Sequence, residues 1–498
     1  MKYSDFRQHI LRHFGLLPTT DQNAAIDVYM QFLSCRESMA AMILRGSAGT
    51  GKTTLVAAMV KTLTELKQKV ILLAPTGRAA KVLSLNCGLP ASTIHRKIYR
   101  QKTGGMEFGL DINLHTDTLF IVDEASMIST IPQMSPADGM PVFNGNGGGV
   151  IDDLVTYVYS GRNCQLMLIG DKAQLPPVGE EEAPALQRTV MECYGLKVFD
   201  CDLNEVVRQK EESGILWNAT MMRQMITHDA VTQLPKMRFN GFADIVAVPG
   251  NELIESLEDS YYHMGQDETI VITRSNKTAN IYNNGIRARV LDHEGELSSG
   301  DRIMIVKNHY FNDNGNFNLN DNPNHEGNNP SSFIHNPSSF SFIANGDMAV
   351  VRRVRRVRDM HDFRFADLVL SFPDYDDAEI EITALLDTLQ SESPALTAEQ
   401  HKQLYESVMQ DYADLPYKAD RMKALKKDIY YNALQIKFAY AVTCHKAQGG
   451  QWAHVYVDQG YMTDDMLTPD YIHWLYTAIT RATEKLFLVN WRKELSQH

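Results

Sequence analysis

A glycine-rich stretch near the start of the chain has the residue types and spacing of a phosphate-binding loop. It runs from Gly46 to Thr54 and reads G-S-A-G-T-G-K-T-T. The backbone N–H groups of such a loop surround a polyphosphate, and glycines leave room for the close approach. Lys52 would reach the β- and γ-phosphates, and the Thr53 hydroxyl would bind Mg²⁺. The predicted nucleotide-binding residues here are Gly46, Ala48, Gly49, Thr50, Gly51, Lys52, Thr53 and Thr54.

The flanking segments favour a real phosphate loop over a chance run of glycines. Residues 41–45 are a short apolar run that predicts a buried strand, and residues 55–66 have the spacing of an amphipathic helix. A helix that starts at the loop directs its N-terminal N–H groups toward bound phosphate. Strand, loop and helix together predict a nucleotide-binding α/β domain.

A pair of carboxylates follows another predicted strand. Residues 118–122 are apolar, and Asp123 and Glu124 come directly after them. In a parallel sheet the carboxyl ends of the strands lie at one edge, which is also where a phosphate loop lies. Asp123 could hold Mg²⁺, directly or through water, and Glu124 could polarise an attacking water. Gln174 follows a further strand at 165–169, and a neutral amide at this edge can sense a γ-phosphate.

Three more polar side chains are candidates whose own context leaves alternatives open. Gln22 could offer its amide to an adenine edge, or could be a solvated residue in the first turn of a helix that Thr20 or Asp21 caps. Arg481 is predicted to lie on an apolar helix, where its charge needs a partner, either a γ-phosphate or a buried carboxylate. The surroundings of Arg208 are uninformative by themselves.

Basic and apolar residues further along the chain could contact nucleic acid. Thr76 and the basic residues of a turn at 75–81 could bind phosphodiesters, or could form a solvated helix start. A glycine turn at 103–108 predicts a hairpin with Met106 and Phe108 near its tip. Exposed apolar residues at a hairpin tip suit stacking on bases or wedging between them, whereas the alternative is a small packed excursion.

The composition predicts a globular protein of about three domains. The chain has 498 residues, of which 44% are hydrophobic and 22% are charged. Its six cysteines include no Cys-x-x-Cys pair, so neither a zinc site nor a disulfide framework is indicated. There is no signal-like N-terminus and no run of about 18 apolar residues, so we expect a soluble, cytoplasmic protein. The net charge of −13 argues against nucleic acid at first sight, but residues 374–420 alone hold twelve acidic residues and two lysines.

A second set of apolar runs predicts another α/β segment. Residues 293–431 interrupt this set with short strand-like segments, which predict a small β-barrel-like insert. The apolar runs of strand length lie at 267–273, 438–442, 455–457 and 486–489.

The predicted insert contains three unusual stretches. An asparagine-rich, low-complexity loop at 312–340 is expected to be disordered without a partner. Five arginines lie between Arg352 and Arg358. They could contact phosphates, or they could pair with the acidic segment at 374–420.

Taken in order, these stretches resemble the motif series of superfamily 1 helicases, and within it the 5′→3′ branch of RecD/Dda-like helicases. They extend from residue 22 to residue 482, and the complete set is far more specific than the phosphate loop alone. The matching pieces are Gln22, G-S-A-G-T-G-K-T-T, A-P-T-G-R-A-A, S-T-I-H-R, D-E-A-S-M, G-D-K-A-Q-L-P-P-V-G, V-V-R-Q, A-N-G-D, T-C-H-K-A-Q-G and Y-T-A-I-T-R-A.

The resemblance implies an α/β fold of two RecA-like domains with ATP in the cleft between them. The first domain would cover residues 1–200, with a pin insert at about 92–117. The second would cover residues 201–292 together with 432–498. An SH3-like β-barrel at 293–431 would be inserted in the second domain.

The resemblance also implies roles for individual residues. In the ATP site, Gln22 would contact adenine, and Gly449 would join the phosphate loop in binding ATP. The implied catalytic residues are Lys52, Asp123, Glu124, Gln174 as γ-phosphate sensor, and Arg208 and Arg481 as arginine fingers, with Thr53 and Asp123 holding Mg²⁺. The implied DNA-contacting residues are Pro75, Thr76, His95, Met106, Phe108, Thr443, His445 and Lys446, and the hairpin with Met106 and Phe108 would be the strand-separating pin.

The implied activity is ATP- and Mg²⁺-dependent movement 5′→3′ on single-stranded DNA with unwinding of a 5′-tailed duplex. Such an enzyme would act as a monomer, and residues 312–340 could bind other proteins. Two alternatives remain open: a DNA-stimulated ATP switch or remodeller that translocates without separating strands, and an RNA helicase. The sequence does not indicate whether the role lies in repair, replication or recombination.

Overall fold

The computed structural model describes residues 3–101, 108–132, 143–144, 148–206, 213–227, 234–310, 342–425 and 427–497. These residues form two compact units. The unit that we call the nucleotide unit holds the described residues up to Arg274 and those from Val442 onward, and the barrel unit holds the described part of Ser275–Ala441. Among the described residues, no helix is long and apolar enough to cross a membrane.

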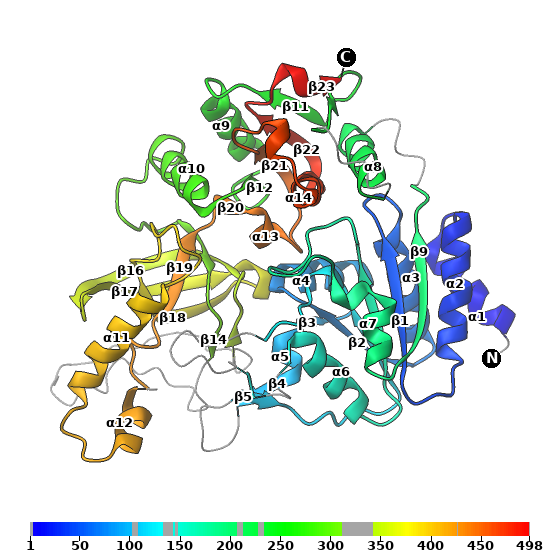
Figure 1. Cartoon of the computed structure of the whole chain (residues 1–498), viewed down its shortest axis with the longest axis horizontal. Helices are drawn as coiled ribbons and strands as arrows, with labels where there is room; N and C mark the ends of the chain where they lie inside the picture. The colour runs from blue at the N-terminus through cyan, green and yellow to red at the C-terminus, as the bar shows by residue number, and fades with distance from the viewer. Residues whose placement is uncertain are drawn as a thin grey trace. The chain divides into compact units, whose positions relative to one another are not determined.

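The first sheet of the nucleotide unit is parallel and has six strands (Figure 1). Apolar runs of five to seven residues form its central strands because both faces of a parallel sheet are covered by helices. All five residues of the strand before Asp123 are buried, as are all seven before the phosphate loop. In sheet order the strands are β3 (Ala91–Thr93), β2 (Lys69–Ala74), β6 (Thr118–Val122), β8 (Gln165–Gly170), β1 (Ala40–Gly46) and β9 (Lys197–Leu203).

Helices cover both faces of this sheet (Figure 1). On one face, Ile26 of α2, Leu55 of α3 and Leu83 of α4 share a core with the sheet residues Met42 and Ile121. That face carries α1 (Tyr3–Phe14), α2 (Thr20–Leu33), α3 (Lys52–Glu65) and α4 (Gly77–Cys87), and the other carries α5 (Ile94–Ile98), α6 (Val150–Ser160) and α7 (Arg188–Cys193).

The second sheet of the nucleotide unit has five strands, and the pairs β11–β22, β21–β22 and β12–β21 are parallel. The chain therefore has two RecA-like sheets, as the resemblance implied. In sheet order the strands are β11 (Ile245–Val248), β22 (Ala482–Val489), β21 (Trp452–Asp458), β12 (Thr269–Thr273) and β20 (Ala441–Thr443). The accompanying elements are α8 (Gly214–Thr227), α9 (Leu253–His263), α13 (Cys444–Ala447), α14 (Pro469–Ile479) and the short pair β10 (Met237–Arg238) and β23 (Ser496–Gln497).

The predicted hairpin is present, but Phe108 is placed differently from the prediction. β4 (Tyr99–Gln101) and β5 (Phe108–Leu110) pair antiparallel, with Gln101 opposite Phe108. β7 (Phe143–Asn144) adds a third strand beside β5. Phe108 thus belongs to a paired strand rather than to the turn, while Met106 lies outside the described residues.

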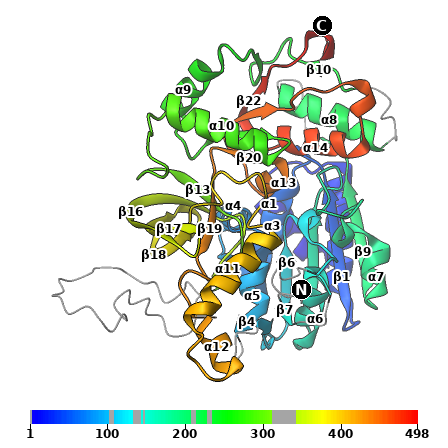
Figure 2. The same ribbon diagram turned by 60° about the vertical axis from the view of Figure 1, so that its left-hand side comes forward.

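The barrel unit is a closed five-stranded barrel (Figure 2). Leu368 and Leu370, two residues apart on β17, lie on the same face of that strand and are fully buried. The strands are β13 (Arg302–Ile305), β16 (Met348–Met360), β17 (Phe363–Phe372), β18 (Ala378–Leu385) and β19 (Leu434–Phe438). The unit also contains α10 (Asn276–Arg289), the short pair β14 (His309–Tyr310) and β15 (Phe342–Ile343), α11 (Ala398–Asp411) and α12 (Lys418–Leu425).

The acidic segment supplies the barrel strand β18, the helix α11 and the start of α12. Leu404 and Val408 of α11 pack against Phe363 and Phe365 of β17. Thr397 caps α11 with a capping box. The arginine-rich strand β16 has three carboxylate contacts: Arg352 with Glu379, Arg355 with Glu381, and Arg358 with Asp367. The asparagine-rich loop at 312–340 lies outside the described residues.

Candidate nucleotide-binding and catalytic site

The phosphate loop connects β1 to α3 and relies on glycine at two positions. Gly49 and Gly51 have φ values of 76° and 73°, in the left-handed region that favours glycine. A Cβ atom at Gly49 would lie 2.9 Å from Leu216 Cδ2, so the Leu216 side chain would have to shift to admit it. Lys52 is the first residue of α3, and its Nζ donates to the Gly46 carbonyl at 2.9 Å. The Thr53 side chain is exposed beside it.

Gln22 ties α2 to the phosphate loop. Its Nε2 donates to the Thr50 carbonyl at 2.8 Å, and its Oε1 accepts from Thr19 N–H at 3.0 Å. The second contact completes a capping box in which Thr19 caps the helix, so the prediction that Thr20 or Asp21 is the cap was wrong. Asp21 instead accepts the N–H groups of Asn204 and a neighbouring residue at 2.7 and 3.0 Å. The adenine contact of Gln22 stays a prediction.

The two carboxylates lie where β6 ends. The Oδ1 atom of Asp123 accepts the Glu124 N–H at 2.9 Å. Burial, followed by the charge of Glu124, raises the pKa of Asp123, and the ammonium of Lys52 opposes that shift. Glu124 has φ 52° and ψ 38°, the left-handed conformation that non-glycine residues rarely adopt. Such strain clusters at functional sites, and the catalytic role of Glu124 stays a prediction.

Arg481 approaches Glu124 from the second RecA-like sheet. Its Nη1 lies 3.9 Å from Glu124 Oε1, and only 3% of the Arg481 side chain is exposed. Gln174 lies between them: in the amide orientation that satisfies both neighbours, Nε2 donates to Glu124 Oε2 at 3.2 Å and Oε1 accepts from Arg481 Nη2 at 3.1 Å. α14 ends at Ile479, so Arg481 lies just beyond the helix and not on it as predicted.

α14 also grips the loop that carries Gln174. We call residues 171–175 the sensor loop. Thr477 Oγ1 accepts the Leu175 N–H at 2.8 Å, and His473 Nδ1 donates to the Ala173 carbonyl at 2.9 Å. The Tyr476 hydroxyl contacts both Ala48 N–H and the Asp171 carboxylate. The predicted pieces Lys52, Asp123, Glu124, Gln174 and Arg481 are therefore brought to one place, whereas Arg208 lies outside the described residues.

Gly449 lies against the start of α4, where a Cβ atom would be 3.0 Å from Thr76 Oγ1 and 3.1 Å from Ala79 Cβ. The Thr76 hydroxyl accepts the Ala79 N–H and so caps α4. These contacts bring the stretches with Pro75 and Thr76 close to the stretch 443–449. The ATP contact of Gly449 stays a prediction.

The other predicted DNA residues occupy two short helices of the nucleotide unit. His95 lies in α5, and burial lowers its pKa to about 4, so it is neutral at physiological pH. Thr443 precedes α13, and His445 and Lys446 lie in it. The Thr443 side chain makes no capping bond with that helix and is half-buried.

Comparisons with known proteins agree with this arrangement. A family model described as AAA domain matches residues 34–180, and one described as UvrD-like helicase C-terminal domain matches residues 438–489. The two matched regions include Lys52, Glu124 and Gln174 on one side and Arg481 on the other. The chain is thus similar to RecD-like helicases of superfamily 1. It is therefore an ATP-hydrolysing enzyme.

Individual relatives match this chain over different lengths. The ATP-dependent RecD2 DNA helicase of Deinococcus radiodurans is 33% identical over 137 residues, which are 28% of this chain and 16% of that protein. The conjugal transfer protein TraA of Rhizobium radiobacter is 27% identical over 283 residues, 53% of this chain and 22% of that protein. An uncharacterized protein, R530 of Acanthamoeba polyphaga mimivirus, is 23% identical over 538 residues and covers 94% of this chain and 98% of its own length.

Among solved structures, two Pif1 helicases cover nearly the whole chain. A Bacteroides Pif1 helicase in complex with ADP-AlF3 and ssDNA has a TM-score of 0.45 and 13% identity, covering 97% of this chain and 95% of that one. Pif1 helicase from Candida albicans has a TM-score of 0.42 and 14% identity, covering 97% of each chain.

Sequence reasoning missed the residues that hold the helicase site together. Tyr476 and Thr477 lie in the Y-T-A-I-T-R-A stretch, where only Arg481 drew a prediction. A tyrosine within an apolar helix was the available signal, because a buried hydroxyl needs a partner. Arg78 is a second example, since its guanidinium lies 4.4 Å from the centroid of the Trp452 ring and contacts Gln451 instead of standing in solvent.

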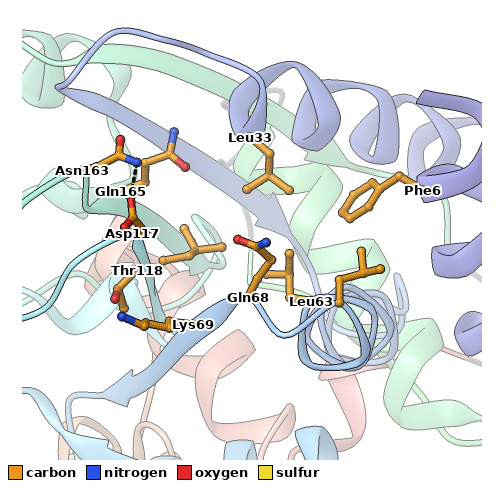
Figure 3. Close-up of a pocket in the computed structure, with 11 residues that line it drawn as sticks. Phe6, Leu33, Leu63, Gln68, Lys69, Asp117, Thr118, Asn163 and Gln165 are labelled. Carbon is orange, nitrogen blue, oxygen red and sulfur yellow. Dashed lines mark hydrogen bonds between the residues drawn. The ribbon is translucent and has the colours of Figure 1, made fainter. Parts of the chain in front are cut away.

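A pocket of about 450 Å³ lies at the amino ends of β2, β6 and β8, at the opposite edge of the sheet from the phosphate loop (Figure 3). Phe6, Leu33 and Leu63 form its apolar wall, and Asn163 and Asp117 are hydrogen-bonded to each other at 2.7 Å on the polar side. None of the predicted site residues lines this pocket.

Proposed function

We propose that this helicase hydrolyses ATP between its two RecA-like sheets and thereby moves 5′→3′ along single-stranded DNA, separating a duplex ahead of it. The observation that carries the proposal is the contact of Arg481 with Glu124 at 3.9 Å, bridged by Gln174. A cation and an amide from distant parts of the chain converge where a terminal phosphate would lie above the phosphate loop.

The side chains at this place suit hydrolysis of a phosphoanhydride. Glu124 accepts a hydrogen bond from the attacking water and takes its proton as the oxygen–phosphorus bond forms. Lys52 and Arg481 stabilise the negative charge on the phosphoryl oxygens, and ADP leaves with the bridging oxygen. The ion pair of Arg481 with Glu124 is therefore the contact that arrival of a triphosphate replaces.

The residues present also fit Mg²⁺. Asp123 Oδ1 already accepts an N–H bond, and burial and the neighbouring Glu124 raise its pKa, a shift that a dication would oppose. The exposed Thr53 hydroxyl at the start of α3 is a second oxygen donor. We propose that Asp123 and Thr53 hold Mg²⁺, which when bound would neutralise phosphate charge.

We also propose DNA contacts for residues of the nucleotide unit. Thr76, His95, Thr443, His445 and Lys446 all belong to the nucleotide unit, and the Gly449–Thr76 contact brings two of their stretches together. Contacts with one strand from both RecA-like halves allow closure on ATP and opening after hydrolysis to become directed movement.

Strand displacement tests the proposal. ATP should release the labelled strand of a 5′-tailed duplex and leave a 3′-tailed duplex intact, and Lys52→Ala should abolish both release and ATP hydrolysis. Hydrolysis without release on either tail would support a translocating switch instead. Stronger stimulation of hydrolysis by RNA than by DNA oligonucleotides would indicate an RNA helicase.

A further inference from the structure

The Tyr476 hydroxyl joins two loops of the nucleotide site. It accepts the Ala48 N–H of the phosphate loop at 3.0 Å and donates to Asp171 Oδ2 of the sensor loop at 2.6 Å. The direction of both bonds is fixed, because an N–H group only donates and an ionised carboxylate only accepts. Tyr476 itself is 1% exposed and lies on α14, so its phenol cannot exchange these partners for bulk water.

Hydrogen bonds hold the sensor loop on both sides of Gln174. Asp171 Oδ1 accepts the Ala173 N–H at 2.9 Å, and the Gln448 side chain donates to the Leu175 carbonyl at 2.6 Å. Thr477, the residue after Tyr476, holds the Leu175 N–H. A shift of the Asp171 carboxylate is therefore transmitted to Ala173, the residue before Gln174, while Thr477 and Gln448 hold Leu175 on its other side.

We propose that Tyr476 is a positioning residue that couples the phosphate loop to the sensor loop. This inference rests on the proposed ATP-driven function and deepens it. When phosphate occupies the loop and Ala48 N–H moves, the phenol must follow or lose its bond, and Asp171 moves with it. Gln174 is thereby set against Arg481 only when the loop is filled. Tyr476 does not touch the nucleotide but acts through Ala48 and Asp171.

Tyr476→Phe tests the coupling because it removes one oxygen atom and keeps the packing. We expect the affinity for ADP to change less than about threefold, while DNA-stimulated kcat falls about 10- to 100-fold, the range for a buried hydrogen bond to a charged group. The affinity for a dT oligonucleotide should also stop responding to nucleotide: the ratio measured with ADP and with a non-hydrolysable ATP analogue should move to within about twofold of one.

Tyr471→Phe is the matched control. Tyr471 lies on the same helix, is equally buried and donates to Gln459, away from both loops. It should lower stability to a similar degree and leave the nucleotide-dependent DNA affinity as in the wild type. Asp171→Asn supplies a second variant. If the two residues act in the same series of contacts, the double variant with Tyr476→Phe should lose no more DNA-stimulated kcat than the more damaging single variant.

The possible outcomes distinguish failure of the coupling role from failure of the proposed function. A wild type that hydrolyses ATP and changes DNA affinity with nucleotide, beside a Tyr476→Phe variant that does both equally well, overturns the coupling role alone. Additive losses in the double variant would also overturn it. A wild type that shows neither activity contradicts the proposed function itself.

Discussion

The left-handed backbone at Glu124 allows strain and catalysis to be separated by two substitutions at one position. Both Glu124→Ala and Glu124→Gly remove the carboxylate and its contacts with Arg481 and Gln174. They differ only in the tolerance for φ 52° and ψ 38°. A left-handed conformation costs an L-residue about 1–2 kcal/mol, and glycine's greater freedom in the unfolded chain costs roughly 0.5–1 kcal/mol. Glu124→Gly should therefore be more stable than Glu124→Ala by up to about 1 kcal/mol.

Thermal unfolding measures this difference. The transition to follow is the one whose midpoint temperature rises when ADP is added, because it reports unfolding of the unit that binds nucleotide. A difference of 1 kcal/mol corresponds to about 1–2 °C in a unit of this size. Lys61, exposed within α3, is the control position: there glycine should be less stable than alanine by about 1 kcal/mol. Both Glu124 variants should hydrolyse ATP at least about 100-fold more slowly than wild type. If Glu124→Gly melts at or below Glu124→Ala, the backbone strain is not real.

Three further predictions follow from other parts of the chain. Gln174→Glu should lower kcat for ATP about 100-fold with ADP affinity unchanged, because it places a second carboxylate beside Glu124; normal hydrolysis would remove Gln174 from the site. Phe108→Ala should leave DNA-stimulated ATPase within about twofold while reducing strands released per ATP, and undiminished release would place the pin elsewhere. Burial, and then the charge of Lys307, lowers the pKa of His401 to about 4, below its unfolded value near 6.5. Because the unfolded chain binds the imidazole proton more tightly, His401 leaves the free energy of unfolding unchanged well above pH 6.5 and lowers it by on the order of 2 kcal/mol by pH 5. His401→Gln should reduce that loss in pH-dependent unfolding.

Much of the sheet framework could be predicted because buried parallel strands are continuous apolar runs. β6 was predicted with the bounds that the structure has, and β8 with one residue missing from its end. Where a turn interrupts a run without a polar residue, the prediction was wrong. The run at 438–442 is divided between β19 and β20, because the chain leaves the barrel at Ala439 and Tyr440 before entering the second sheet.

The site could be predicted only as a set of separate pieces. The glycines and Lys52 are local signals, since a loop of nine residues specifies its own shape. The contact of Tyr476 with Ala48 joins residues 428 positions apart, and no local pattern encodes such a pairing. Likewise, α14 ends before Arg481 although the apolar pattern continues, because the next strand begins at Ala482. The types of catalytic side chain could be predicted from the sequence, whereas the contacts that position them depend on tertiary packing.

Binding of two nucleotides to wild type and to Arg481→Ala tests the central claim most directly. Calorimetry with single-stranded DNA and Mg²⁺ present should show that wild type prefers a non-hydrolysable ATP analogue over ADP. Arg481→Ala should lose about 10- to 100-fold of affinity for the analogue, the worth of a charge-assisted bond, and keep ADP affinity within about threefold. An Arg481→Ala variant that prefers the analogue as strongly as wild type would show that this arginine does not reach the terminal phosphate, and the account would be contradicted.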